Sequence, residues 1–333
     1  MVTFNASAST PDGGTIISYE WDFGDGNITI IGDNETITPI ITHHYTAPGD
    51  YNVTLTVTDS ESKSDTTWNM LTVQPLKYYL TVKTDPPCLS PAPTPSSGWY
   101  DNCTYVNLTA PEYTNVSADT RYRFDYWDVN GTSQGTNVNN ITVHMNANYT
   151  ATAHYILQYL VTFAQTGLDN TANSTVVTVN GAPKNYGNLP FQMWADNGSS
   201  VTYSYSTIVS STVSGKRFRL DSISSPPSPF NVTGPVTITG NYKTQYEITF
   251  SQSGVGADFT GTVVTIDETG YGVSGLPVSF WWDENSQHNF SFASPLVVNA
   301  SKQYIWVSTS GLSILQNDTL TITGSGSVTG YYS

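Results

Sequence analysis

Apolar and polar residues alternate in short runs along much of the chain, for example at 53–57 (VTLTV), 79–82 (YLTV) and 320–323 (LTIT). A period of two places every second side chain on the same face, so each run predicts a β-strand with one buried face. Turn-forming residues such as 11–14 (PDGG) separate the runs. No window keeps the spacing of an amphipathic helix. The pattern therefore predicts an all-β chain built of sandwiches or barrels.

A weak repeat of 80–90 residues occurs three times after residue 75. Each copy opens on a Tyr-containing strand, carries a Trp near its middle and closes on a strand that contains Ile and Thr. The aligned tryptophans are Trp99, Trp194 and Trp282. Successive copies abut without a Gly/Ser-rich linker, at 153–160 and 241–246. We therefore expect four modules with short, stiff junctions.

The amino-acid composition narrows the range of functions that the chain could have. Charged residues make up 11 % of the 333 positions, against about 25 % in an ordinary soluble domain, and the net charge is −15. Only 11 Lys and Arg are present, which argues against nucleic-acid binding, because phosphate contacts need clustered cations. No run of about 18 apolar residues predicts a membrane span. The first ten residues lack a basic and an apolar segment, so we expect a signal peptide to have been removed or to lie upstream.

Glycosylation sequons are unusually frequent. There are 16 Asn-x-Ser/Thr sequons among 26 Asn, whereas 85 Ser and Thr in 333 residues would give about seven by chance. The excess favours N-glycosylation, although Asn and Thr also suit loops and exposed strand faces. In the run 51–57, Asn52 lies on the face opposite Val53, so a glycan there would point into solvent. The candidate glycosylation sites are Asn5, Asn27, Asn34, Asn52, Asn102, Asn107, Asn115, Asn130, Asn140, Asn148, Asn173, Asn197, Asn231, Asn289, Asn299 and Asn317.

The two cysteines, Cys88 and Cys103, flank a Pro/Ser-rich loop. We predict a disulfide between them, which would close a loop of about 15 residues and stabilise the fold by about 3 kcal/mol. Such a bond fits an oxidising compartment. The alternative is a pair of unrelated buried thiols. Metal binding is disfavoured because no third ligand lies close in sequence.

The first 75 residues carry a specific motif pattern: 19–26 (YEWDFGDG), then His44 with Tyr45, then 48–59 (PGDYNVTLTVTD). This pattern closely resembles the PKD domain, an Ig-like sandwich of extracellular and archaeal surface proteins. The resemblance implies that Trp21 and Phe23 point into the core and that His44 is structural. Family members usually carry a strand before the segment matching residues 2–7, so we expect this module to lack its first strand.

Residues 76–333 resemble, more loosely, the β-repeats of bacterial and archaeal surface proteins related to the listerial internalin B-repeat. Together the two resemblances imply an all-β fold of tandem Ig-like β-sandwich modules in a rod-like array. The expected domains are a PKD-like domain lacking its first strand and three β-repeats, at 1–75, 76–156, 157–244 and 245–333. Below they are called module 1 and repeats 1, 2 and 3.

Candidate chemistry is sparse. The five His accompany no Gly-x-Ser-x-Gly, His-Glu-x-x-His or Lys-containing phosphate loop, so we predict no enzyme activity and no catalytic residues. Some PKD domains bind Ca²⁺ near the turn that matches 11–13, which makes Asp12 a candidate Ca²⁺ ligand through the resemblance. Asp22 and Asp25 flank a Gly turn, where they would either ligate Ca²⁺ or cap the turn; we favour capping.

These features predict a secreted, N-glycosylated structural subunit of an extracellular filament or surface layer. Copies of the chain would join head to tail by β-strand addition, completing the first module. Its partners would be copies of itself and covalent glycans, with no nucleic acid and no membrane span. Two alternatives stay open: a fragment of a longer surface protein with its missing strand upstream, and a carbohydrate- or surface-binding adhesin or non-catalytic arm that stacks sugars on Trp281 or Trp282.

Overall fold

The chain folds almost entirely into β-strands. The computed structural model describes residues 1–32, 36–224 and 226–333, and the helical elements among them are two three-residue 3-10 turns, η1 (Tyr186–Asn188) and η2 (Val273–Gly275). The all-β prediction is confirmed. The chain divides into two compact units: Met1–Thr114 with Phe124–Tyr155, and Asn115–Arg123 with Ile156–Ser333. Within the described ranges, no helix has the length and apolar character needed to cross a membrane.

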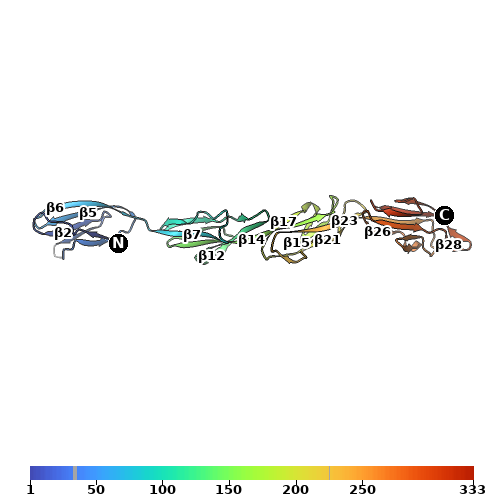
Figure 1. Ribbon diagram of the computed structural model, residues 1–333, viewed down its shortest axis with the longest axis horizontal. Coiled ribbons are helices and arrows are strands. Elements are labelled where there is room, and N and C mark those ends of the chain that lie inside the picture. The colour runs from blue at the N-terminus through green and yellow to red at the C-terminus, as the bar shows by residue number, and fades with distance from the viewer. Residues whose placement is uncertain (33–35, 225) are drawn as a thin grey trace. The chain divides into compact units, whose positions relative to one another are not determined.

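Module 1 is a sandwich of two antiparallel sheets. Its strands are β1 (Val2–Asn5), β2 (Ile16–Asp22), β3 (Ile28–Gly32), β4 (Ile40–His43), β5 (Gly49–Asp59) and β6 (Ser64–Val73). One sheet is β1-β4 and the other has the order β3-β2-β5-β6, with β5 beside β6 in Figure 1. Alternation in β2 and β5 buries Trp21, Val53 and Leu55, and Phe23 follows at 1 % exposure. The inward positions predicted for Trp21 and Phe23 are confirmed.

The three repeats contain the remaining strands. Repeat 1 has β7 (Lys77–Asp85), β8 (Gly98–Asp101), β9 (Thr104–Thr109), β10 (Tyr113–Asn115), β11 (Thr120–Val129), β12 (Thr132–Thr136), β13 (Asn140–Met145) and the start of β14 (Tyr149–Thr166). Repeat 2 has β15 (Thr175–Val179), β16 (Ala182–Asn185), β17 (Phe191–Asp196), β18 (Ser200–Val201), β19 (Tyr203–Tyr205), β20 (Ile208–Ser210), β21 (Lys216–Ile223), β22 (Phe230–Asn231) and the start of β23 (Val236–Ser253). Repeat 3 has β24 (Val264–Ile266), β25 (Thr269–Tyr271), β26 (Val278–Asp283), β27 (Gln287–Phe292), β28 (Leu296–Asn299), β29 (Lys302–Tyr304), β30 (Trp306–Gly311), β31 (Asn317–Thr321) and β32 (Gly326–Tyr332).

Successive repeats share strands. The start of β14 pairs in parallel with β7, and its second half pairs in parallel with the start of β23. The second half of β23 in turn pairs in parallel with β32. In every repeat, therefore, the first strand lies beside the last strand and runs parallel to it. The last strand of repeats 1 and 2 also continues without a break as the first strand of the next repeat, as β23 does where it reaches β26 in Figure 1.

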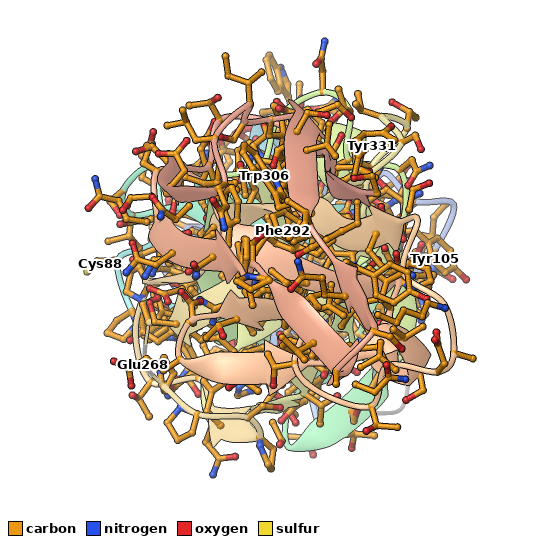
Figure 2. The ribbon with its side chains drawn as sticks, turned by 90° about the vertical axis from the view of Figure 1, so that its right-hand side faces the viewer. Cys88, Tyr105, Glu268, Phe292, Trp306 and Tyr331 are labelled. Atoms are coloured by element: carbon orange, nitrogen blue, oxygen red, sulfur yellow. The ribbon has the colours of Figure 1, made fainter. Side chains whose placement is uncertain are left out.

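Each repeat buries its own apolar side chains. Repeat 1 buries Leu80 and Trp127 completely, and repeat 2 has a core around Phe163 and Phe218. Repeat 3 has a separate core around Phe250 and Phe292. Figure 2 looks onto repeat 3 and shows Phe292 between the strands, with Tyr331 at the margin.

The disulfide predicted between Cys88 and Cys103 does not form. Both thiols are free and exposed. Cys88 follows the C-terminal end of β7, whereas Cys103 follows Asp101, which pairs with Lys77 at the N-terminal end of the same strand. The length of β7, about 25 Å at 3.3 Å per residue, thus lies between the two turns. A disulfide needs Cα atoms within about 7 Å, so closeness in sequence was misleading here.

The strand register also corrects the alignment of the tryptophans. Asp196 pairs with Gln158, and Asp283 pairs with Gln245. Asp196 and Asp283 therefore occupy equivalent positions, and so do the residues two before them, Trp194 and Trp281. The sequence alignment had matched Trp194 with Trp282 instead. Trp282 lies in the core at 9 % exposure, while Trp281 lies on the outer face. The adjacent tryptophans thus occupy opposite faces of β26, as a strand requires.

Candidate functional site

Four polar side chains join repeat 2 to repeat 3 where β23 passes from one to the other. Arg217 on β21 donates from Nε to Oε1 of Gln245 over 2.8 Å. Gln245 on β23 donates from Nε2 to Oδ1 of Asp283 over 2.8 Å, and Arg219 donates to Oδ2 of Asp283 over 3.0 Å. We call this set the clamp. It ties the last strands of one repeat to β26 of the next.

The same clamp stands where repeat 2 begins. Arg121 donates to Gln158 over 2.8 Å, and Gln158 donates to Asp196 over 2.7 Å. Arg123 donates to the second oxygen of Asp196 over 3.1 Å. Residue types, atoms and bond lengths thus match those of the clamp at the start of repeat 3. Such agreement shows that the clamp is a repeated structural device rather than a chance surface contact.

A tryptophan stacks under the first arginine of each clamp. The guanidinium carbon of Arg121 lies 4.3 Å from the ring centre of Trp194, and that of Arg217 lies 4.3 Å from Trp281. A cation over an aromatic face contributes about 0.5–2 kcal/mol, more when the pair is desolvated. The stack also fixes the guanidinium plane, so that its Nε points at the glutamine. Trp281 is therefore covered by Arg217 instead of being free to stack on a sugar.

The aspartates of the two clamps are ionised at neutral pH, which favours their hydrogen bonds to the arginines. Burial raises the pKa of Asp283, but the hydrogen bonds from Arg219 and Gln245 lower it more, so the pKa lies below its ordinary value. Asp196 behaves in the same way: burial raises its pKa, but the hydrogen bonds from Gln158 and Arg123 lower it by more, so the pKa lies below its ordinary value. The bond to Asp283 raises the pKa of Arg219. Both carboxylates are therefore ionised and paired over the whole neutral range.

Repeat 3 lacks the arginines of the clamp. Tyr332 in β32 stands where Tyr242 stands in β23, and Ile305 exchanges backbone hydrogen bonds of 2.9 and 3.0 Å with Ser333. Because Tyr332 matches Tyr242, the next residue, Ser333, matches Lys243. The backbone partner of Lys243 in repeat 2 is Arg219. Ile305, 40 % exposed, thus occupies the Arg219 position, and Gln303 occupies that of Arg217. Close by, Val307 and Tyr331 are 57 % and 40 % exposed. We call Ile305, Val307 and Tyr331 the apolar end of repeat 3.

Module 1 is open along one edge of its sandwich. Among the described residues, β6 is the edge of its sheet and β1 pairs with β4 alone. On β6, Thr67 and Asn69 are exposed although they pair with the core residues Leu55 and Val53. In a closed sandwich such inward positions are buried. The inward face of β6 is therefore uncovered by the described residues.

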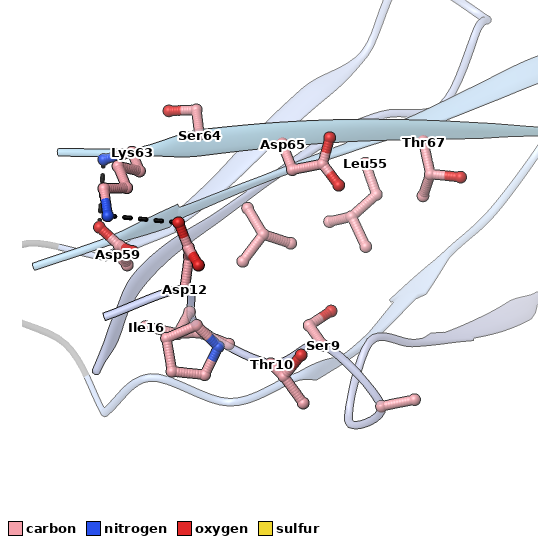
Figure 3. A pocket seen from close by; sticks show the side chains of 13 residues that line it. Ser9, Thr10, Asp12, Ile16, Leu55, Asp59, Lys63, Ser64, Asp65 and Thr67 are labelled. Carbon is pink, nitrogen blue, oxygen red and sulfur yellow. Dashed lines mark hydrogen bonds and ion pairs between the residues drawn. The ribbon is translucent and has the colours of Figure 1, made fainter. Parts of the chain in front are cut away.

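Two cavities follow this edge and meet. One, of about 700 Å³, lies between β6 and the 8–12 loop, and Figure 3 shows Asp65 and Thr67 above it with Ser9 and Thr10 below. The other, of about 320 Å³, lies between β6 and β1. Leu55 and Thr67 line both. Together they form one groove along positions 64–71 of β6, which we call the β6 groove.

The floor of the β6 groove contains an unsatisfied polar atom. Trp21 lines the groove and is 6 % exposed. Its Nε1 is buried and has no hydrogen-bond partner among the described residues. A buried hydrogen-bond donor without a partner lowers the stability of the fold by about 1–3 kcal/mol, so such groups are uncommon in protein cores. Phe4, Val53 and Leu71 make the rest of this part apolar.

The candidate Ca²⁺ ligand Asp12 is paired with a cation of the protein. Its side chain is 84 % exposed, and Oδ2 lies 3.2 Å from Nζ of Lys63, as Figure 3 shows. The carboxylates of Asp12 and Glu61 both raise the pKa of Lys63, Glu61 more strongly. Over the described ranges, no group of three or more His, Cys, Asp or Glu is placed to hold a metal ion.

Asp22 and Asp25 cap turns, as favoured above. Asp22 accepts the amide of Gly24 over 2.9 Å, and Asp25 accepts that of Asn27 over 3.1 Å. Asp25 also lies 2.7 Å from Nε2 of His43, a bond that lowers the pKa of this carboxyl. His43 stacks on Phe23, whereas His44 is exposed. The structural histidine of module 1 is therefore His43 and not His44.

The sequon asparagines lie at the surface. Asn34 lies outside the described residues, and the other fifteen are all exposed. Two sequon side chains accept hydrogen bonds at Oδ1: Asn107 accepts from Thr142, and Asn289 accepts from Thr319. The glycan bond forms at Nδ2, so these contacts leave the reactive atom available. The exposure of all fifteen side chains is compatible with N-glycosylation.

A Ser-His-Asp arrangement in repeat 3 was missed by the sequence analysis. Nδ1 of His288 lies 2.6 Å from Asp267, and Nε2 lies 2.9 Å from Oγ of Ser286. The Ser286 hydroxyl, however, donates to the carbonyl of Asp283 over 2.5 Å. Ser199 makes the equivalent bond to Asp196 over 2.6 Å in repeat 2, where Val201 replaces the histidine. This serine therefore shapes a turn common to both repeats.

Comparison with known proteins identifies module 1. Residues 1–73 match the family model of the PKD domain, which confirms the resemblance for this module. A microbial collagenase of Vibrio alginolyticus is 39 % identical over 75 residues, which make up 22 % of this chain and 8 % of the collagenase. The chain thus spans less than a tenth of the length of that relative.

Proposed function

We propose that this chain is a non-catalytic structural subunit of an extracellular filament or surface layer. The observation that carries the proposal is the way the repeats are joined, through shared strands and two matching clamps. Strand continuity and charge-assisted hydrogen bonds resist bending between repeats. This resistance suits a protein that spans a distance and bears force. We interpret the repeats as surface-protein β-repeats akin to the internalin B-repeat.

Assembly would proceed head to tail. Module 1 has an uncovered edge, and strand addition to such an edge gives many backbone hydrogen bonds in one step. A contact between two different surfaces of the same chain is heterologous, and it builds an open filament when its rotation does not close a ring. The partners of the chain are thus copies of itself. The PKD match supports an extracellular or cell-surface location.

N-glycans would cover the remaining surface. Fifteen exposed sequons and only 11 % charged residues leave hydration to be supplied by something other than charge. Glycans on exposed asparagines would supply it. Intact mass of the native protein tests this part: we expect a mass well above 36.2 kDa that falls on enzymatic deglycosylation. A native mass equal to that of the bare chain would contradict it.

The structural role itself is tested by sedimentation of the purified chain over a wide concentration range. Head-to-tail assembly predicts a broad, concentration-dependent series of species. A single monomeric species at the highest concentration would contradict the proposal.

A second candidate is the non-catalytic arm of a larger secreted protein with a surface-binding role. The collagenase relative favours it, since the similarity lies within one PKD-like region of a much longer protein. Trp99, 64 % exposed and without an arginine of the clamp above it, is the tryptophan best placed to stack on a sugar. Binding on a glycan array that is lost in Trp99→Ala would favour this candidate.

A further inference from the structure

We propose that the outer face of module 1 carries a sugar-stacking site, at which the N-glycan of Asn52 lies against the ring of Trp68. The inference rests on the N-glycosylation proposed above and names the surface that one glycan occupies. Trp68 and Met70 of β6 form this surface, which we call the β6 outer face. It is distinct from the inward side of β6, because successive side chains of a strand point to opposite faces of the sheet.

The register of β5 and β6 places a sequon beside the β6 outer face. Asn52 pairs with Met70, and Thr54, the hydroxyl residue of the same sequon, pairs with Trp68. Asn52 and Trp68 are therefore diagonal neighbours on one face of the sheet, with Cα atoms about 7–8 Å apart. Asn52 is exposed, whereas Val53 beside it is buried in the core. A glycan on Asn52 would thus begin next to the indole ring, within reach of its first sugar units.

Trp68 is left without a partner by the described part of the protein. The Trp68 side chain is 65 % exposed, and that of Met70 is 53 % exposed. Each of the other seven tryptophans contacts an aromatic ring, a cation or a hydrogen-bond acceptor. No such contact is made by Trp68 with the described residues. Its indole face is therefore available to a group that the bare chain does not contain.

A sugar suits the chemistry of this face. The C–H groups of a sugar ring pack on the electron-rich face of an indole, while its hydroxyl groups stay in water. The neighbours of Trp68 on the face are the uncharged Asn52, Thr54, Thr66 and Met70, so a neutral ligand meets no unpaired charge there.

The covalent glycan of Asn52 is favoured over a free carbohydrate or a protein as the occupant. Attachment beside Trp68 gives this glycan a high effective concentration at the site, which a separate molecule would have to exceed. Cover is also needed, because β6 is a ten-residue edge strand among the described residues and apolar side chains on such an edge promote aggregation. A glycan on this face would cover Trp68 and Met70 together.

Hydroxyl-radical footprinting of the full chain from its native host tests the stack, because the oxidation rate of an indole follows its exposure to solvent. We expect Trp68 to be oxidised about threefold or more slowly in native protein than after enzymatic deglycosylation. Asn52→Gln should raise the rate to that of the deglycosylated protein. Trp99 in repeat 1, 64 % exposed, is the internal reference and should not respond to Asn52→Gln.

Variants of the sequon hydroxyl separate the sugar from the asparagine itself. Thr54→Val destroys the sequon and keeps Asn52, so it should expose Trp68 as strongly as Asn52→Gln does. Thr54→Ser keeps the sequon and should keep the protection. Asn289→Gln removes a sequon of repeat 3 and is the matched control, which should leave Trp68 protected.

Mass spectrometry of the peptide that contains Asn52 distinguishes the ways in which the inference could fail. A glycan on Asn52, with Trp68 oxidised equally fast before and after its removal, would overturn the stack. Protection that survives Asn52→Gln would overturn Asn52 as the source and assign the cover to another glycan or a bound partner. An unmodified Asn52 in a chain modified at other sequons would overturn the inference and leave the proposed glycosylation intact. A chain without any glycan would contradict both.

Discussion

Asp283 and Asp196 are the residues on which the junctions between repeats depend most. Each accepts one hydrogen bond from a glutamine of the shared strand and one from an arginine of the preceding repeat. Hydrogen bonds to an ionised acceptor contribute about 1.5–3 kcal/mol, roughly twice a neutral one. Removing the carboxylate leaves the two donors on opposite sides of the junction without a common acceptor.

Asp283→Asn should therefore lower the stability of the unit formed by repeats 2 and 3 by about 1–2 kcal/mol at pH 7. The pKa of Asp283 is lower in the folded than in the unfolded protein, so its contribution is present above the unfolded value of about 3.9 and is lost as the pH falls through the folded pKa. Calorimetric midpoints of parent and variant should differ at pH 7 and converge in acid. Glu268→Gln removes an exposed carboxylate of repeat 3 outside the clamp, and as the control it should change the stability little. A gap that widened in acid would contradict the assignment.

The cysteines give a second test at this scale. Both thiols are exposed and lie in turns at opposite ends of β7. We expect two maleimide groups to attach to the native protein without reductant. A protein that takes up none until it is reduced would show that Cys88 and Cys103 are bridged after all.

The long strands β14 and β23 each supply the last strand of one repeat and the first strand of the next. Equivalent tyrosines anchor β23 and β32 to neighbouring segments. The Tyr242 hydroxyl of β23 donates to the carbonyls of Val176 and Ser206, and the Tyr332 hydroxyl of β32 donates to those of Val263 and Ala293. Burial raises the pKa of Tyr242, as expected for a phenol that stays neutral in the core. The recurrence marks this tyrosine as part of the repeat.

Tyr242→Phe should destabilise the unit of repeats 2 and 3 by about 1–2 kcal/mol, because two partly buried carbonyls lose their donor while the ring is kept. Thermal unfolding followed by calorimetry measures the effect. Tyr246→Phe is the matched control: it lies on the same strand, and its hydroxyl makes only a long 3.5 Å contact with Glu284. Equal effects of the two variants would show that the carbonyl anchor is unimportant.

The elements were more predictable than their pairing. Alternation alone identified runs such as 53–57 and 79–82, because a half-buried strand imposes a period of two wherever it lies. Register was not predictable from the same signal: aligning Trp194 with Trp282 in place of Trp281 shifts every side chain to the other face. The paired cysteines failed for a related reason, since the sequence does not reveal that a whole strand lies between their turns.

The clamp could have been found from the sequence, with one further step. Arg121 and Arg123 recur as Arg217 and Arg219, and each Trp-x-Asp segment recurs one repeat later. What no sequence pattern supplied is that the glutamine of the shared strand bridges them, because that contact joins three segments distant in the chain. The Ser286–His288 contact was hidden for the same reason, since Asp267 comes from a different hairpin.

At the scale of the whole molecule, low charge and many exposed sequons belong together. With 37 charged residues in 333 positions, the bare chain has little to keep it hydrated, and glycans at the fifteen exposed sequons would fill that role. Enzymatic deglycosylation of native material should therefore lower its solubility sharply, as measured by the protein remaining in solution after centrifugation. Mock-treated protein is the control. Deglycosylated protein that stays as soluble as the control would contradict this role for the sugars.

Electron microscopy of native material tests the central claim most directly, namely that the chain is a structural subunit that polymerises head to tail. The account predicts filaments with one subunit per axial repeat, in which module 1 of each copy meets repeat 3 of the next. Isolated particles of single chains at high protein concentration would contradict it.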